Sequence, residues 1–66
     1  MSVAKITEIS ATSKKSFDDA FNRGIAKACQ SLDGVTGAWV MDQEAQIDKG
    51  KVTSYIVRMR ITFLLK

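Results

Sequence analysis

The chain has 66 residues and carries ten Lys or Arg against seven Asp or Glu, a net charge of +3 at pH 7 without a basic block. It has no His and a single Cys, Cys29, which excludes an intrachain disulfide and a Cys/His zinc site. No apolar run is long enough to cross a bilayer and no signal-peptide pattern is present, so we expect a cytoplasmic protein.

A chain of this size has little margin of stability. It buries only about 60% of its unfolded surface on folding, and the hydrophobic gain roughly cancels the conformational entropy. Because neither disulfides nor zinc are available, oligomerisation is the expected supplement. The dispersed charge gives no support to nucleic-acid binding.

The stretch from Val3 to Ala11 has an imperfect alternation of apolar and polar residues, with Ile6 and Ile9 among the apolar ones. This pattern predicts a first strand, which we expect at the edge of a sheet. Residues 12–15 are a polar connection.

The stretch from Ser16 to about Leu32 has the spacing of an amphipathic helix. Polar residues occupy the opposite arc, so the helix must bury one face against a sheet made from the rest of the chain. The apolar stripe contains Phe17, Ala20, Phe21, Gly24, Ile25, Ala28 and Leu32.

Both ends of this helix carry recognisable signals. Ser16 with Asp19 three residues later is a capping pattern, although Ser13 is an equal candidate for the cap. Gly34, after Asp33, is expected to take the left-handed conformation that closes a helix.

Gly24 lies inside the helix, where glycine is unfavourable. It is either incidental or marks the close approach of a strand. Cys29 is expected on the buried side of the helix, as a packing residue rather than a reactive one.

The segment Thr36–Ile47 predicts a second strand, and residues 48–51 a hairpin loop. Simple alternation separates its residues into two faces. The odd face contains Gly37, Trp39, Met41, Gln43 and Ala45, and the even face Ala38, Val40, Asp42, Glu44 and Gln46.

The segment Val52–Leu65 predicts an unusually long third strand, about 45 Å if fully extended. Its length suggests contact with neighbouring molecules. Its odd face is the expected floor for the helix and contains Tyr55, Val57, Met59, Ile61, Phe63 and Leu65. Its even face contains Ser54, Ile56, Arg58, Arg60, Thr62 and Leu64.

The element order is therefore β-α-β-β, in one domain over residues 1–66. We predict an α+β fold in which a three-stranded antiparallel sheet wraps around one helix.

This pattern resembles the dodecins, small β-α-β-β proteins that form hollow homododecamers and, in their best-known branch, store flavin. The resemblance covers nearly the whole chain without gaps. It rests on Thr12-Ser13, Ser16-Phe17, Val40-Met41-Asp42-Gln43, Ile47, Tyr55 and Phe63. It implies a non-catalytic assembly of the chain with itself that binds a small ligand or ion.

The chain departs from the flavin-binding pattern at two positions. Flavin-binding dodecins have a Trp at the start of the second strand, where this chain has Gly37, and a Gln after the third-strand Tyr, where it has Ile56. The usual stacking surface and the usual polar contact to the flavin ring are both missing. We therefore expect an impaired flavin site, with Gly37, Trp39, Ile56 and Arg58 as the candidate ligand-binding residues.

Trp39 leaves two alternatives open. It shares a strand face with Gly37, about 7 Å further along, so it could stack FMN, riboflavin or another flat ligand in a displaced pocket. Alternatively, it packs at a subunit contact, against Arg58 or Arg60 by cation–π attraction.

A second branch, the calcium dodecins, resembles the chain around residues 40–43 and also lacks the flavin Trp. This resemblance makes calcium a candidate ligand, with Asp42, Glu44 and Asp48 as its oxygen donors. Side chains spaced about 7 Å apart on one strand cannot chelate one ion, so copies would have to meet at a symmetry axis. Alternatively, these acidic side chains bind no ion and are simply exposed to solvent along the strand.

The sequence shows no nucleophile paired with a base that a third group could orient, so we predict that the chain is not an enzyme. The leading hypothesis is a hollow dodecin-like shell that binds a small ligand or ion. The alternative is an interaction module that contacts an anionic partner through Arg58 and Arg60. We expect no membrane and no nucleic acid among its partners.

Overall fold

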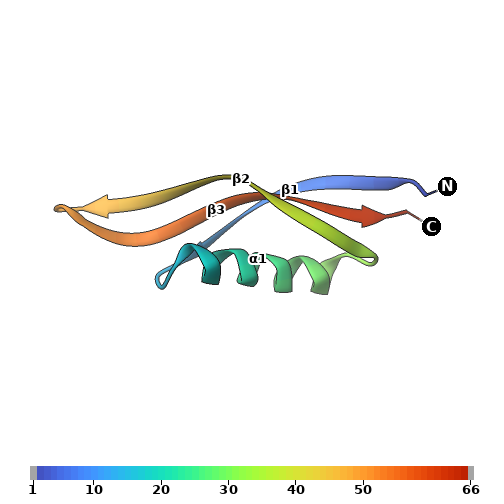
Figure 1. Cartoon of the computed structure of the whole chain (residues 1–66). Coiled ribbons are helices and arrows are strands. Elements are labelled where there is room, and N and C mark those ends of the chain that lie inside the picture. The colour runs from blue at the N-terminus through green and yellow to red at the C-terminus, as the bar shows by residue number, and fades with distance from the viewer. Residues whose placement is uncertain (1, 66) are drawn as a thin grey trace.

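The computed structural model describes residues 2–65. It contains the predicted β-α-β-β order, with β1 (Ala4–Ser13), α1 (Phe17–Ser31), β2 (Val35–Asp48) and β3 (Lys51–Leu64). The three strands form one antiparallel sheet in the order β1-β3-β2, and α1 lies along one face of it (Figure 1). The prediction that the first strand is an edge is confirmed.

The core lies between α1 and the middle of β3. Val57, Met59 and Ile61 are fully buried against Ala20 and Ala28 of the helix. This confirms the middle of the odd face of β3 as the floor for the helix, whereas Leu65 at its end is 51% exposed. At one end of the interface, the rings of Phe17 and Tyr55 meet edge to face, with centroids 5.0 Å apart.

Gly24 lies where α1 approaches the sheet closely. A Cβ atom built there would lie 2.5 Å from Cε of Met59 and 3.2 Å from Cβ of Ala11. The close-approach interpretation of this glycine is therefore confirmed, since both β3 and β1 contact it.

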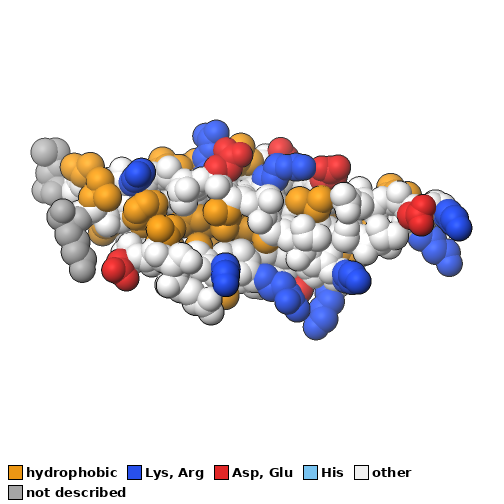
Figure 2. Space-filling view, turned by 180° about the vertical axis from the view of Figure 1, so that it is seen from behind, with side chains coloured by type: hydrophobic (Ala, Val, Ile, Leu, Met, Phe, Trp, Pro, Cys, Tyr) orange, Lys and Arg blue, Asp and Glu red, His pale blue; other side chains and the backbone are white. Residues whose placement is uncertain are grey.

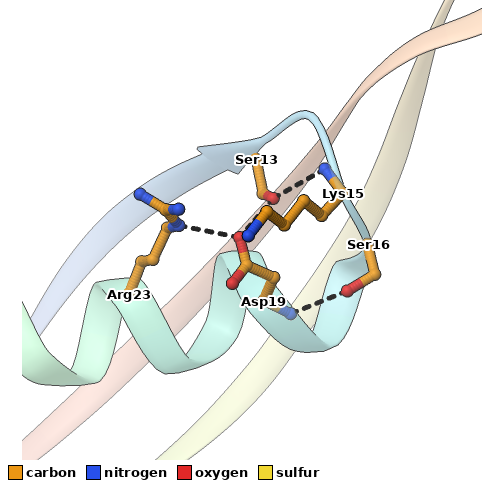
Figure 3. Close-up of polar contacts among 5 residues, drawn as sticks. All are labelled: Ser13, Lys15, Ser16, Asp19 and Arg23. Atoms are coloured by element: carbon orange, nitrogen blue, oxygen red, sulfur yellow. Dashed lines mark hydrogen bonds and ion pairs between the residues drawn. The ribbon is translucent and has the colours of Figure 1, made fainter.

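Ser16 begins the helix, and its hydroxyl accepts a hydrogen bond of 3.0 Å from the backbone N–H of Asp19. Ser13 has a different role, because its buried hydroxyl donates to the Asp19 carboxylate and accepts from the N–H of Lys15. Arg23 donates to the same carboxylate at 2.7 Å, so Asp19 joins the end of β1 to the first turn of α1 (Figure 3).

The other end of the helix differs from expectation. Leu32 already has extended backbone angles, and its N–H donates to the carbonyl of Ala28, so the helix closes before the glycine. Gly34 has the expected positive φ of 75°, but it turns the chain into β2, where its carbonyl accepts from the N–H of Leu64.

The expectation that Cys29 is buried is wrong, because its thiol is exposed. Residues 21, 25 and 29 form the ridge of α1 that faces β2, and β2 leaves this ridge partly uncovered. The hairpin loop is also shorter than predicted. Asp48 and Lys51 pair in the ladder, leaving Lys49 and Gly50, both with positive φ, as a two-residue turn.

The molecule is elongated, with extents of 51 × 19 × 13 Å and a Cα radius of gyration of 13.6 Å. A compact chain of this length has a radius of gyration of about 11 Å. The β2–β3 hairpin continues well beyond the start of α1, and the face of the sheet opposite α1 has no covering layer in the described chain (Figure 1). Within the described residues, no helix has the length and hydrophobicity needed to span a membrane.

Candidate ligand-binding site

The face of the sheet opposite α1, called the outer face below, holds the candidate site. Because Val57, Met59 and Ile61 in the middle of β3 are buried under the helix, the even residues of β3 from 56 to 62 point to the outer face. Residues directly opposite each other on paired strands share a face. The β2–β3 register therefore places Gly37 beside Thr62, and Trp39 beside Arg60, on the outer face.

The same register places Ile56 beside Glu44, and Arg58 beside Asp42. All four predicted ligand-binding residues thus lie on one face of the sheet. Acidic and basic side chains alternate along this side of the molecule, seen at the upper edge of Figure 2.

A β-bulge at Met41 corrects the predicted faces of β2. Val40 pairs with Met59 and Asp42 with Arg58, so Met41 is an extra residue in β2. An extra residue reverses the alternation that follows it. Trp39 and the acidic residues Asp42 and Glu44 were predicted on opposite faces, and the bulge brings them onto the same one.

Arg58 is held by two carboxylates. Its Nη1 donates to Oδ1 of Asp42 at 2.9 Å, and its Nη2 donates to Oε1 of Glu44 at 2.7 Å. The hydrogen bond to Glu44, followed by that to Asp42, raises the pKa of the Arg58 guanidinium above its ordinary value. The charge that would attract an anionic partner is therefore largely offset.

The three predicted calcium ligands are not brought together within one chain. Asp42 and Glu44 are both paired with Arg58, whereas Asp48 lies at the hairpin turn opposite Lys51. Among the described residues, no three His, Cys, Asp or Glu side chains form a group that could hold a metal ion. The calcium site remains a prediction that depends on contact between copies.

A second feature, a hollow of about 350 Å³ between α1 and β2, was not foreseen from the sequence. The i, i+4 spacing of residues 21, 25 and 29 on α1 was the signal in the sequence that could have indicated it. The helical wall of the hollow is Phe21, Ile25 and Cys29, and its strand wall is Val35, Thr36, Gly37 and Ala38.

Comparison with known proteins identifies the family. The family model described as Dodecin matches residues 3–66. The chain belongs to the dodecin family. A dodecin from Streptomyces davaonensis, 28% identical, superposes with a TM-score of 0.92, and the alignment covers 98% of this chain and 96% of that one.

Calcium dodecin from Mycobacterium tuberculosis is 27% identical over 66 residues, which cover all of this chain and 93% of the relative. Its crystal structure, described as a calcium-chelating antigen with a novel calcium-binding site, superposes with a TM-score of 0.83 at 28% identity. That alignment covers 97% of this chain and 91% of the other.

Family membership confirms the predicted fold and the resemblance on which it was based. Dodecins are non-catalytic binding proteins, which also confirms that the chain is not an enzyme. The chain is a small-ligand-binding protein of the dodecin family.

Proposed function

We propose that the chain forms a hollow homododecamer that binds a small ligand or ion in the cytoplasm, with the usual flavin site impaired. The uncovered outer face of the sheet is the observation that carries this proposal. The chain exposes 4840 Å² of surface, against about 4200 Å² for a compact monomer of this mass. The exposed large apolar side chains are Val3, Ile6, Trp39, Val40, Met41, Ile47, Val52, Leu64 and Leu65.

Two residues support the impairment of the flavin site. Gly37 lies at the position where flavin-binding dodecins have their stacking Trp, and a Cβ there would meet no atom within 4 Å. Ile56, at the usual Gln position, is only partly buried and presents no hydrogen-bonding group. At these two positions the chain supplies neither the stacking ring nor the hydrogen-bonding side chain of the flavin-binding pattern.

Calcium is the alternative ligand, favoured by the similarity to calcium dodecin. Asp42 and Glu44 supply carboxylates on the outer face, but Arg58 competes for both. A calcium ion would therefore have to displace Arg58 or draw further oxygen ligands from a second copy, since calcium requires six to eight.

The assembly is tested by size-exclusion chromatography with light scattering at micromolar concentration. We expect a mass twelve times the 7.3 kDa of one chain. A monomer at this concentration would overturn the proposal.

The flavin site is tested by titrating riboflavin and FMN and following the loss of flavin fluorescence. The double variant Gly37→Trp/Ile56→Gln should bind about ten- to a hundredfold more tightly than the natural chain, because base–aromatic stacking contributes about 1–3 kcal/mol per ring. Lys27→Trp, which adds an aromatic residue on the exposed side of α1, is the control and should gain nothing. Equal affinity of the natural chain and the double variant would contradict the impairment.

A further inference from the structure

The end of the β2–β3 hairpin carries an apolar pair. Ile47 and Val52 are cross-strand neighbours, and their exposed fractions are 66% and 48%. This part of the hairpin lies beyond the start of α1 (Figure 1). A contact that covers the pair would gain about 25 cal/mol for each Å² of apolar surface removed from water.

The apolar pair points to the helix side of the sheet. The register shift beside Ile47 places its extra residue, Thr53, in β3, so the alternation along β2 continues and Ile47 shares the face of Ala45. Ala45 lies opposite Tyr55, whose ring packs against Phe17 of α1. The apolar inner face of the sheet therefore continues past the helix as an exposed surface.

The hollow between α1 and β2 has room for this pair. Its volume is about 350 Å³, and the side chains of Ile47 and Val52 together have seven carbon atoms. At about 30 Å³ each, the volume of a water molecule in the liquid, these atoms need roughly 200 Å³. Ile47 lies about 30 Å along β2 from Ala38 in the wall of the hollow. Only a second copy can therefore bring the two surfaces together.

The hairpin end and the rim of the hollow carry opposite charges. Lys49 and Lys51 lie at the turn beside the apolar pair. Asp18 lies three residues before Phe21 on the ridge of α1 that lines the hollow, and Asp33 lies between the end of α1 and the start of β2. All four charged side chains are exposed, and within the described residues none of them takes part in a salt bridge.

These charges favour a contact between hairpin end and hollow over one between two hairpin ends. The turn has a net positive charge even when Asp48 is counted, so two hairpin ends would repel each other. At the hollow, the lysines of the turn instead meet two carboxylates. Arg23 and Lys27 do not oppose them, because 3.6 residues per turn place both on the side of α1 opposite the ridge.

We propose that the hairpin end of one copy inserts Ile47 and Val52 into the hollow between α1 and β2 of a neighbouring copy. The lysines of the turn then lie beside the carboxylates at the rim of the hollow. Because the two surfaces differ, the contact is heterologous, and successive copies close into a ring. The inference rests on the proposed function, because it names the surfaces through which copies in the shell meet.

Cys29 lines the hollow and is the only thiol of the chain, so its reactivity reports whether the hollow is covered. We expect N-ethylmaleimide to modify the natural assembly at least tenfold more slowly than Ile47→Ser/Val52→Ser. Val3→Ser is the matched control, because Val3 is 61% exposed and lies at the opposite end of the molecule (Figure 1). Its rate should equal that of the natural chain, and equal rates in all three proteins would overturn the inference.

Cross-linking tests which surfaces meet. In Ile47→Cys, each chain has one thiol at the hairpin end and one in the hollow, so a short bis-maleimide should join copies into products larger than dimers. Ile47→Cys/Cys29→Ser should give no such products. Ser10→Cys is the control for thiol position, because Ser10 pairs with Arg58 on the outer face, and it should not be joined to Cys29.

Three outcomes would contradict the inference. Dimers that persist in Ile47→Cys/Cys29→Ser would show that two hairpin ends meet each other. A particle of full mass in which Cys29 reacts rapidly and no cross-links form would leave the hollow open. Light scattering on the same samples separates this result from a monomeric mass of the natural chain, which would overturn the proposed assembly together with the inference.

Discussion

Arg58 in β3 and Glu44 in β2 are joined across the outer face by a hydrogen bond of 2.7 Å, beside a second bond of 2.9 Å from Arg58 to Asp42. This arrangement satisfies the arginine and occupies both carboxylates. The charges of Arg58, Asp42 and Glu44 therefore largely neutralise one another, which leaves Arg60 as the more available cation. Calcium could bind to these carboxylates only in competition with Arg58.

If calcium is held by the acidic residues of β2, removing Arg58 should increase its affinity. Arg58→Met leaves the charges of Asp42 and Glu44 unbalanced, and we expect several-fold tighter calcium binding by calorimetry. Arg60→Met is the control, because Arg60 contacts Glu8 rather than these carboxylates. Unchanged calcium affinity in Arg58→Met would place the ion elsewhere or exclude it.

Asp19 should make the stability of the fold depend on pH. The hydrogen bond from Ser13, followed by that from Arg23, lowers the pKa of the Asp19 carboxyl below its ordinary value of 3.8. A lowered pKa in the folded state contributes stability above the ordinary value, and this contribution is lost as pH falls through the folded pKa. Urea unfolding at pH 7 and pH 3 should therefore show a smaller loss of stability on acidification in Asp19→Asn than in the natural chain.

Asp18→Asn is the matched control for this experiment. Asp18 lies in the same first turn of α1 but is exposed, so its replacement should leave the pH dependence close to that of the natural chain. An equal effect of both variants would assign the dependence to the helix dipole rather than to the contacts of Asp19.

Gly24→Ala should destabilise the fold, although alanine is the better helix former. The added Cβ would lie 2.5 Å from Cε of Met59 and 3.2 Å from Cβ of Ala11, so the fully buried Met59 side chain would have to shift. Overpacking costs about 1–3 kcal/mol, against a gain of up to about 1 kcal/mol in helix propensity, so we expect a net loss of up to about 2 kcal/mol in the free energy of unfolding.

In a Met59→Val background, where the side chain is shorter, adding Gly24→Ala should cost less stability than it does in the natural chain. Gly37→Ala is the control for a glycine with open surroundings and should change stability by less. A stabilised Gly24→Ala would show that Met59 can move away freely.

Substitutions at the two residues of the hairpin turn should change the free energy of unfolding in opposite directions. Lys49 and Gly50 have φ angles of 52° and 77°, a region that costs ordinary L-residues about 1–2 kcal/mol. Gly50→Ala should lower the free energy of unfolding by about that amount, whereas Lys49→Asn should raise it slightly, because Asn tolerates this conformation. Equal effects of the two substitutions in thermal unfolding would contradict the turn geometry.

The sequence by itself determined the order of the elements, the helical stripe and the apolar face of β3. These follow from periods of 3.6 and 2 that each segment carries locally, so Val57, Met59 and Ile61 could be assigned to the core without knowing their neighbours. The same local chemistry indicated a cap at Ser16 or, equally, at Ser13, and a turn near Gly50; the structure decided for Ser16. The departures at Gly37 and Ile56 were also visible in the sequence.

Only the tertiary structure decided which residues share the outer face. The bulge at Met41 depends on the register between β2 and β3, which no residue of β2 signals alone, and it moved Asp42 to the side of Trp39. The exposure of Cys29 likewise depends on how far β2 lies from α1. Strand pairing and packing between segments distant in sequence settle such features, because local periodicity sets the face of a residue only as long as its register is unbroken.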